Sequence, residues 1–153
     1  MMLVGSDFID NNASFNTQMK RNGPSLFVRA YAASGTDENT PVAIQFMGSG
    51  YNATALAASI YAYVGVPEGT QSVGAGSWGW YQIRGPVSDM QATTDSIGSV
   101  GHAITWEVGT LFASTSAYQG LDTKGQIGVL TTEISSIATH DIYLTGAWAT
   151  PIA

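Results

Sequence analysis

The sequence predicts an all-β fold, a compact β-sandwich or small β-barrel with an extended N-terminal arm and at most short helices. Its apolar runs are dominated by β-branched and aromatic residues, which favour strands. The 18 glycines include turn residues between these runs, as expected for a sandwich or a barrel. No long stretch shows the 3.6-residue apolar period of an amphipathic helix.

Residues 1–24 are expected to form the arm, and residues 25–153 a single β-rich domain. Within the arm, apolar side chains are spaced among polar ones before Asn22-Gly23-Pro24 interrupts the chain. A short helix over 14–21, capped by Ser14, is one interpretation. A partly disordered terminus is the other. The apolar residues of the arm are Phe8, Ile9, Phe15 and Met19.

The first strand of the body has the clearest pattern. Leu26, Val28 and Ala30 recur at every second position, which is the signature of a half-buried strand. A polar turn over 34–40 follows, and the alanines of 53–60 are compatible with one or two helical turns. The other expected strands are 42–47, 60–66, 78–83, 87–93, 103–108, 111–114, 127–134 and 142–148.

Composition and charge exclude several classes of function. Charged residues make up 10% of the chain, against about 25% in typical domains, which suits a protein covered by partners. The net charge is −6, and the five scattered Lys and Arg residues do not supply the basic patch that nucleic acids or anionic membranes require. No segment is apolar for the roughly 18 residues that a membrane helix needs. With no cysteine, disulfides and thiolate sites are also excluded.

No motif supplies convincing catalytic or cofactor chemistry. Gly74–Gly79 matches the letters of a dinucleotide fingerprint, but a strand-like sequence follows where a helix is required. Ser77 lacks the glycine two positions before it that a nucleophile elbow needs. His102 and His140 are too far apart to suggest a metal site, and the carboxylates are dispersed. We therefore expect no enzyme, no cofactor and no metal.

Aromatic residues gather in one predicted strand. Trp78 and Trp80 are two positions apart and therefore share one face, while Tyr81 and Ile83 share the other. Both faces are rich in apolar residues, as in a strand packed between a core and a partner. A platform for stacking sugars is the alternative, because aromatic faces also bind sugar rings. Gly85-Pro86 is expected to end the hydrogen bonding of this strand.

The most informative stretch runs from Val64-Gly65-Val66-Pro67 to the segment 74–87, which reads GAGSWGWYQIRGPV. It resembles a pattern in head decoration proteins and other virion structural proteins of tailed phages. There a VGV strand leads through a glycine turn to a strand of the form GWVQ-x-x-G-x-V. Tyr81 stands at the usual valine position, and Gly85 matches the closing glycine. A weaker likeness continues to residue 111, through Ala103-Ile104 and Val108–Leu111.

The resemblance implies a non-enzymatic role, as a decoration or cement protein that binds and stabilises the assembled major capsid lattice. It implies a place on the outer surface of the virion capsid, which assembles in the host cytoplasm. The partners would be the major capsid protein and further copies of the chain, in a homotrimer that matches the capsid threefold axes. Candidate contacts with the capsid or other subunits are Phe8, Ile9, Phe15, Met19, Trp78, Trp80 and Tyr81.

Two other functions fit the same sequence. One is a different virion component, such as a fibre, spike or tail protein. The other is a carbohydrate-binding β-sandwich module, for which the aromatic residues would supply the sugar platform.

Overall fold

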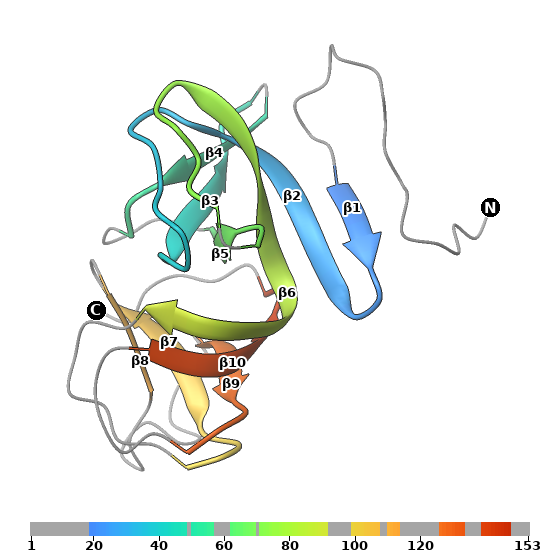
Figure 1. Ribbon diagram of the computed structural model, residues 1–153, viewed down its shortest axis with the longest axis vertical. Coiled ribbons are helices and arrows are strands. Elements are labelled where there is room, and N and C mark those ends of the chain that lie inside the picture. The colour runs from blue at the N-terminus through green and yellow to red at the C-terminus, as the bar shows by residue number, and fades with distance from the viewer. Residues whose placement is uncertain are drawn as a thin grey trace.

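In the computed structural model, the described residues are 19–48, 50–56, 62–69, 71–91, 99–107, 110–113, 126–133 and 139–147. They contain ten strands and no helix, so the prediction of an all-β fold is confirmed (Figure 1). The strands are β1 Met19–Asn22, β2 Ser25–Ala32, β3 Val42–Phe46, β4 Tyr51–Thr54, β5 Tyr63–Pro67, β6 Ser77–Gln91, β7 Ala103–Glu107, β8 Thr110–Ala113, β9 Gln126–Leu130 and β10 Thr139–Thr145.

Five of these strands close a small barrel. Their order is β2-β4-β3-β5-β6, and β6 then pairs with β2 to complete the ring. The β2–β4 pairing is parallel, whereas the other four pairings of the ring are antiparallel. β1 extends one edge of β2 as a hairpin beside the barrel (Figure 1). The prediction of a small barrel is therefore correct for the first half of the chain.

The ten-stranded sheet continues from the barrel through β6 into a second part, which we call the second sheet. The first part of β6 pairs with β2, and its last part, from Arg84 to Gln91, pairs with β10. From β10 the order continues through β9 and β7 to β8. In Figure 1, β6 curves from the barrel into this second group of strands, so this one long strand belongs to both the barrel and the second sheet.

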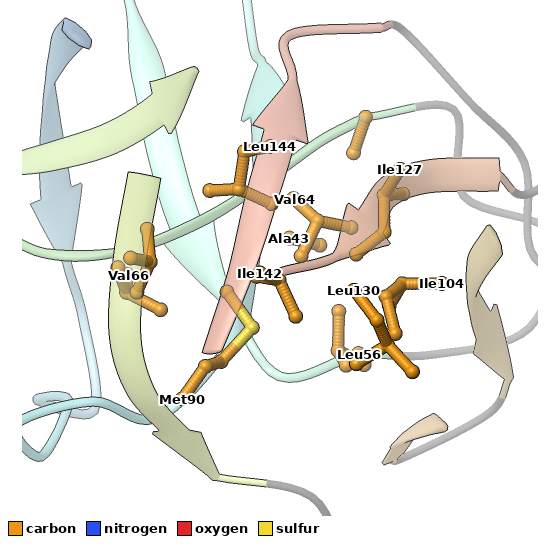
Figure 2. Packing of buried hydrophobic residues seen from close by; sticks show 12 residues of the cluster. Ala43, Leu56, Val64, Val66, Met90, Ile104, Ile127, Leu130, Ile142 and Leu144 are labelled. Carbon is orange, nitrogen blue, oxygen red and sulfur yellow. The ribbon is translucent and has the colours of Figure 1, made fainter. Parts of the chain in front are cut away.

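Two apolar clusters form the core: one fills the barrel, and the other joins the barrel to the second sheet. The barrel interior is filled by Val28, Ile44, Ile83 and the whole side chain of Tyr81, all at most 1% exposed. The second cluster joins the outer wall of β3 and β5 to the facing side of β6, β7, β9 and β10 (Figure 2). Its members are Ala43, Leu56, Ala62, Val64, Val66, Val87, Met90, Ile104, Ile127, Leu130, Ile142 and Leu144. Alternate residues of β3 and β5 thus serve the two cores in turn.

Small residues make the narrow barrel possible. Ala30, Ala32 and Ala53 are buried against the Tyr81 cluster. Gly65 also faces it, because a Cβ there would lie 3.1 Å from a side-chain carbon of Ile83. The space that larger residues would occupy is filled by the Tyr81 ring, since interiors are close-packed.

The structure corrects the expected helices. Residues 19–21 belong to β1, which pairs with β2, so they are not helical; residues 14–18 lie outside the described part. Ala53 and Thr54 belong to β4, so they are not helical either. Residues 57–60 lie outside the described part of the chain. Ala53 lies in a strand because its small side chain fits the barrel interior, and this tertiary packing overrides its local helix preference.

The expected break at Gly85-Pro86 is also wrong. β6 runs without interruption through both residues, which pair with Leu144 and Tyr143 of β10. Gly85 has a φ of +101°, a conformation that glycine adopts readily. The chain therefore bends here instead of ending the strand, and this bend separates the part of β6 in the barrel from the part in the second sheet.

Candidate functional site

The candidate site is the outer face of the barrel over β1, β2 and β6. Residues that alternate with the buried ones project from this face, so it follows directly from the strand register. Tyr31 lies opposite Trp78, and Arg29 lies opposite Trp80. We call this surface the aromatic–cation face; its members are Lys20, Phe27, Arg29, Tyr31, Trp78 and Trp80.

Two cations order the rings on this face. Lys20 Nζ lies 4.7 Å from the centre of the Trp80 ring and 5.1 Å from that of Phe27. The guanidinium carbon of Arg29 lies 5.5 Å from the centre of the Trp78 ring. Such cation–π contacts contribute about 0.5–1 kcal/mol each at exposed sites. They also restrict the side-chain rotamers before any partner arrives, which reduces the entropy lost on binding.

Two further contacts complete the face. Trp78 packs against Tyr31 with ring centres 5.5 Å apart and planes tilted by 54°. Lys20 also forms an ion pair of 2.5 Å with Glu68, whose backbone N–H donates to the Trp80 carbonyl. Both tryptophans and Tyr31 remain half-buried, so a part of each is available to a partner.

An open depression of about 270 Å³ borders the two tryptophans. Glu68, Gln71, Ser72 and Ser77 contribute polar groups to it. A sugar-binding site would need such a depression beside the tryptophan rings, on which a sugar could stack. One face of the Trp80 ring is already occupied by Lys20, however, which reduces the ring surface open to a sugar.

The structure separates the predicted contact residues. Trp78 and Trp80 lie together on the aromatic–cation face, as their spacing predicts. Tyr81 is fully buried inside the barrel, and its hydroxyl is 2.8 Å from Thr36 Oγ1, so it cannot contact a capsid or another subunit in this fold. Met19 is half-buried against the barrel cluster. The remaining three candidates, Phe8, Ile9 and Phe15, lie outside the described residues.

The glutamine and glycine of the phage-like pattern have a structural role that the sequence did not reveal. The Gln82 amide donates hydrogen bonds to the carbonyls of Arg84 and Pro86, at 3.2 and 2.8 Å. It also donates to Ser25 Oγ. These acceptors surround the bend at Gly85, so Gln82 satisfies polar groups at the point where β6 leaves the barrel. The W-x-Q-x-x-G spacing could have indicated this, because it places an amide three residues before a bend.

The residues considered for chemistry lie in turns or in a strand. Gly74–Gly79 opens into β6, and the Ser77 N–H donates to the Gly74 carbonyl in a turn at the start of that strand. His102 accepts a hydrogen bond from the Ser99 N–H, whereas His140 is buried in β10. Among the described residues, no group of three or more His, Asp or Glu side chains could hold a metal ion. The same residues include no helix long and apolar enough to span a membrane.

Comparison with known proteins shows a likeness in structure. No family model matches the chain, and no curated protein is detectably similar to it in sequence. The fold resembles that of the N base of the head fiber gp8.5 of bacteriophage phi29, with a TM-score of 0.52. The match covers 84% of this chain and 98% of the other, at 14% sequence identity. At this identity the likeness concerns the fold.

Proposed function

We propose that the chain is a non-enzymatic structural protein of a phage virion, which decorates the outside of the capsid and stabilises its lattice. The observation that carries this proposal is the aromatic–cation face, a set of half-buried Trp, Tyr and Arg side chains already ordered by contacts with one another. These residue types supply most of the energy at protein interfaces. The fold likeness to a phage head fiber base supports the broader part of this proposal, a structural protein of a phage virion.

The proposed partners are the major capsid protein and other copies of the chain, in a homotrimer on the capsid threefold axes. Three copies that bind together gain effective concentration, which raises avidity by about 10²–10⁴. Weak contacts made by each copy can therefore hold the assembly on the shell. The low charged content of the chain, 10%, suits a surface that is covered on several sides.

The test mixes the purified chain with particles of its source virus that lack the chain, and co-sedimentation then measures how much of the chain binds to the particles. Trp78→Ala and Trp80→Ala should each weaken binding by tenfold or more, because interface tryptophans commonly contribute about 2 kcal/mol or more. Val100→Ala is the matched control, since Val100 is 65% exposed in a turn outside the face. Equal binding by all four proteins would contradict the assignment of the face, and absence of the chain from virions would contradict the function.

The arm is proposed as a second anchor on the shell. Its apolar residues Phe8, Ile9 and Phe15 are spaced among polar ones, as in segments that add to a partner's surface. A variant lacking residues 2–18 keeps β1 and should fold normally, as shown by an unchanged melting temperature. It should bind particles less tightly than the full chain. Unchanged binding would exclude the arm as an anchor.

A base for a head fibre is the second candidate function, and the fold likeness to the phi29 head fiber base favours it. Electron microscopy of particles carrying the chain distinguishes the two. A decoration protein gives a compact density on the shell, whereas a fibre base carries an elongated projection. A glycan array tests the carbohydrate-binding alternative, for which Trp78→Ala should remove any signal.

A further inference from the structure

The fold gathers cations that are far apart in the sequence. Four of the five Lys and Arg residues lie in the segments 19–32 and 77–86, which contain β1, β2 and the barrel part of β6. These strands lie side by side (Figure 1). Neither segment contains an acidic residue, so together they carry a charge of +4, whereas the rest of the chain has eleven carboxylates and one lysine. The chain is therefore strongly polarised, although its net charge is −6.

Three of the four cations lie on the outer side of the barrel. Lys20 and Arg29 belong to the aromatic–cation face. Arg84 extends this face, because the alternation of buried and accessible residues in β6 places it on the same side as Trp80. Its side chain is exposed. The fourth cation, Arg21, is exposed near the end of the β1–β2 hairpin, where its Nε donates to the Gly23 carbonyl.

Glu68 brings a carboxylate to this positive surface. Its Oε2 accepts a hydrogen bond from Lys20 Nζ, which also lies 4.7 Å from the centre of the Trp80 ring. The Glu68 side chain is 38% exposed, and an exposed ion pair of this kind contributes only about 0.2–1 kcal/mol. A carboxylate from a partner can therefore replace Glu68 as the acceptor while Lys20 stays over the ring.

The shape of the charge distribution favours one class of anionic partner. Arginine binds both carboxylates and phosphates through its planar guanidinium. Nucleic acids also stack their bases on open aromatic rings, but Lys20 covers one face of Trp80, and Arg29 and Tyr31 pack against Trp78. A long polyanion would extend beyond the positive strands toward the strongly negative remainder of the chain. A compact acidic patch on a protein meets the positive surface alone.

We propose that the aromatic–cation face, extended by Arg84, binds a carboxylate-bearing surface of a different protein, and that Glu68 weakens this binding by competing for Lys20. The inference rests on the proposed function only for the identity of that protein, which on a virion is the capsid protein under the chain. A polarised chain approaches an acidic surface with its positive side first. The charge distribution therefore orients the chain as well as holding it.

The first test uses a decaglutamate peptide at low salt, with binding followed by tryptophan fluorescence. Arg84→Gln should weaken binding about threefold, and Arg29→Gln/Arg84→Gln about tenfold, because each exposed ion pair contributes up to about 1 kcal/mol. Glu68→Gln should strengthen binding about threefold, because Lys20 loses its competing acceptor. Glu133→Gln is the matched control: it makes the same change of charge at an exposed residue that follows β9, and it should bind as wild type does. Melting temperatures show that all variants are folded.

Several results would overturn the inference. One is binding by Glu68→Gln that is no tighter than that of Glu133→Gln, and another is unchanged binding by the double variant. Tighter binding of a decathymidylate DNA than of the peptide would assign the face to nucleic acid instead. Self-association that salt weakens and the same variants remove would assign it to another copy of the chain.

The particle assay separates this inference from the proposed function. Particles that lack the chain should bind Glu68→Gln more tightly than wild type, and added salt should weaken the binding, because exposed charges are screened. Particle binding that responds to neither change would refute the inference and leave the proposed function standing. If particles bind no form of the chain while the peptide series behaves as expected, the proposed function fails and the inference stands.

Discussion

Replacing Gly85 by alanine should destabilise the protein at the bend that joins the barrel to the second sheet. A Cβ at this position would lie 2.8 Å from the Ser25 Cα and 3.1 Å from the Pro24 carbonyl oxygen. Both atoms are backbone, so no side-chain rotation relieves the contact. Residue 85 also has a φ of +101°, where an L-residue is strained.

The two effects have different magnitudes, and a control separates them. Positive φ costs an L-residue about 1–2 kcal/mol. Overpacking adds about 1–3 kcal/mol. Gly101→Ala carries the strain alone, because Gly101 has a φ of +87° and no atom within 4 Å of a new Cβ. We expect the free energy of unfolding to fall by about 2–5 kcal/mol for Gly85→Ala and by about 1–2 kcal/mol for Gly101→Ala.

Urea unfolding followed by tryptophan fluorescence measures both values, and calorimetry gives the melting temperatures. One kcal/mol corresponds to about 2–4 °C for a chain of this length. Gly85→Ala should therefore melt about 4–20 °C below the wild-type protein and clearly below Gly101→Ala. Equal destabilisation of the two variants would refute the close approach of β6 to the start of β2.

Three further predictions follow from particular contacts. Gln82→Glu should lower the free energy of unfolding by about 0.5–1.5 kcal/mol, because a carboxylate cannot donate to the two carbonyls at the bend. The loss should shrink at acidic pH, where the carboxyl is protonated, and an unchanged urea midpoint at pH 7 would contradict the prediction. Gly128→Ala would place a Cβ 2.6 Å from the Tyr143 carbonyl oxygen, so the β9–β10 pairing should weaken, seen as faster amide exchange in β9. Burial raises the pKa of Tyr81 above its ordinary value of 10.0, although its hydrogen bond with Thr36 opposes this. The stability that the neutral Tyr81 contributes is therefore complete below pH 10 and declines as the pH rises through the folded-state pKa. Tyr81→Phe should reduce the loss of stability at alkaline pH, as measured by urea unfolding. At pH 7 the same variant should lower the free energy of unfolding by about 0.5–1.5 kcal/mol, because the hydrogen bond is lost.

Particular residues show how far sequence reasoning reached. The alternation of Leu26, Val28 and Ala30 predicted β2 and its buried face correctly, because a strand's side-chain period does not depend on its partner. The two-residue spacing of Trp78 and Trp80 likewise placed both on one face. The expected helical turn was wrong for Ala53 and Thr54, since β4 pairs in parallel with β2, a strand that is not its neighbour in the chain.

The sequence by itself determined the all-β class, most strand positions and the division of β6 into a tryptophan face and a Tyr81 face. Those features depend on local periodicity and residue type. Only the tertiary structure decided which of the two faces is buried, because both are apolar and a ring of five strands can enclose just one of them. It also decided that β6 bends at Gly85 and continues, since the hydrogen-bond partners of that segment come from β10, more than fifty residues later in the chain.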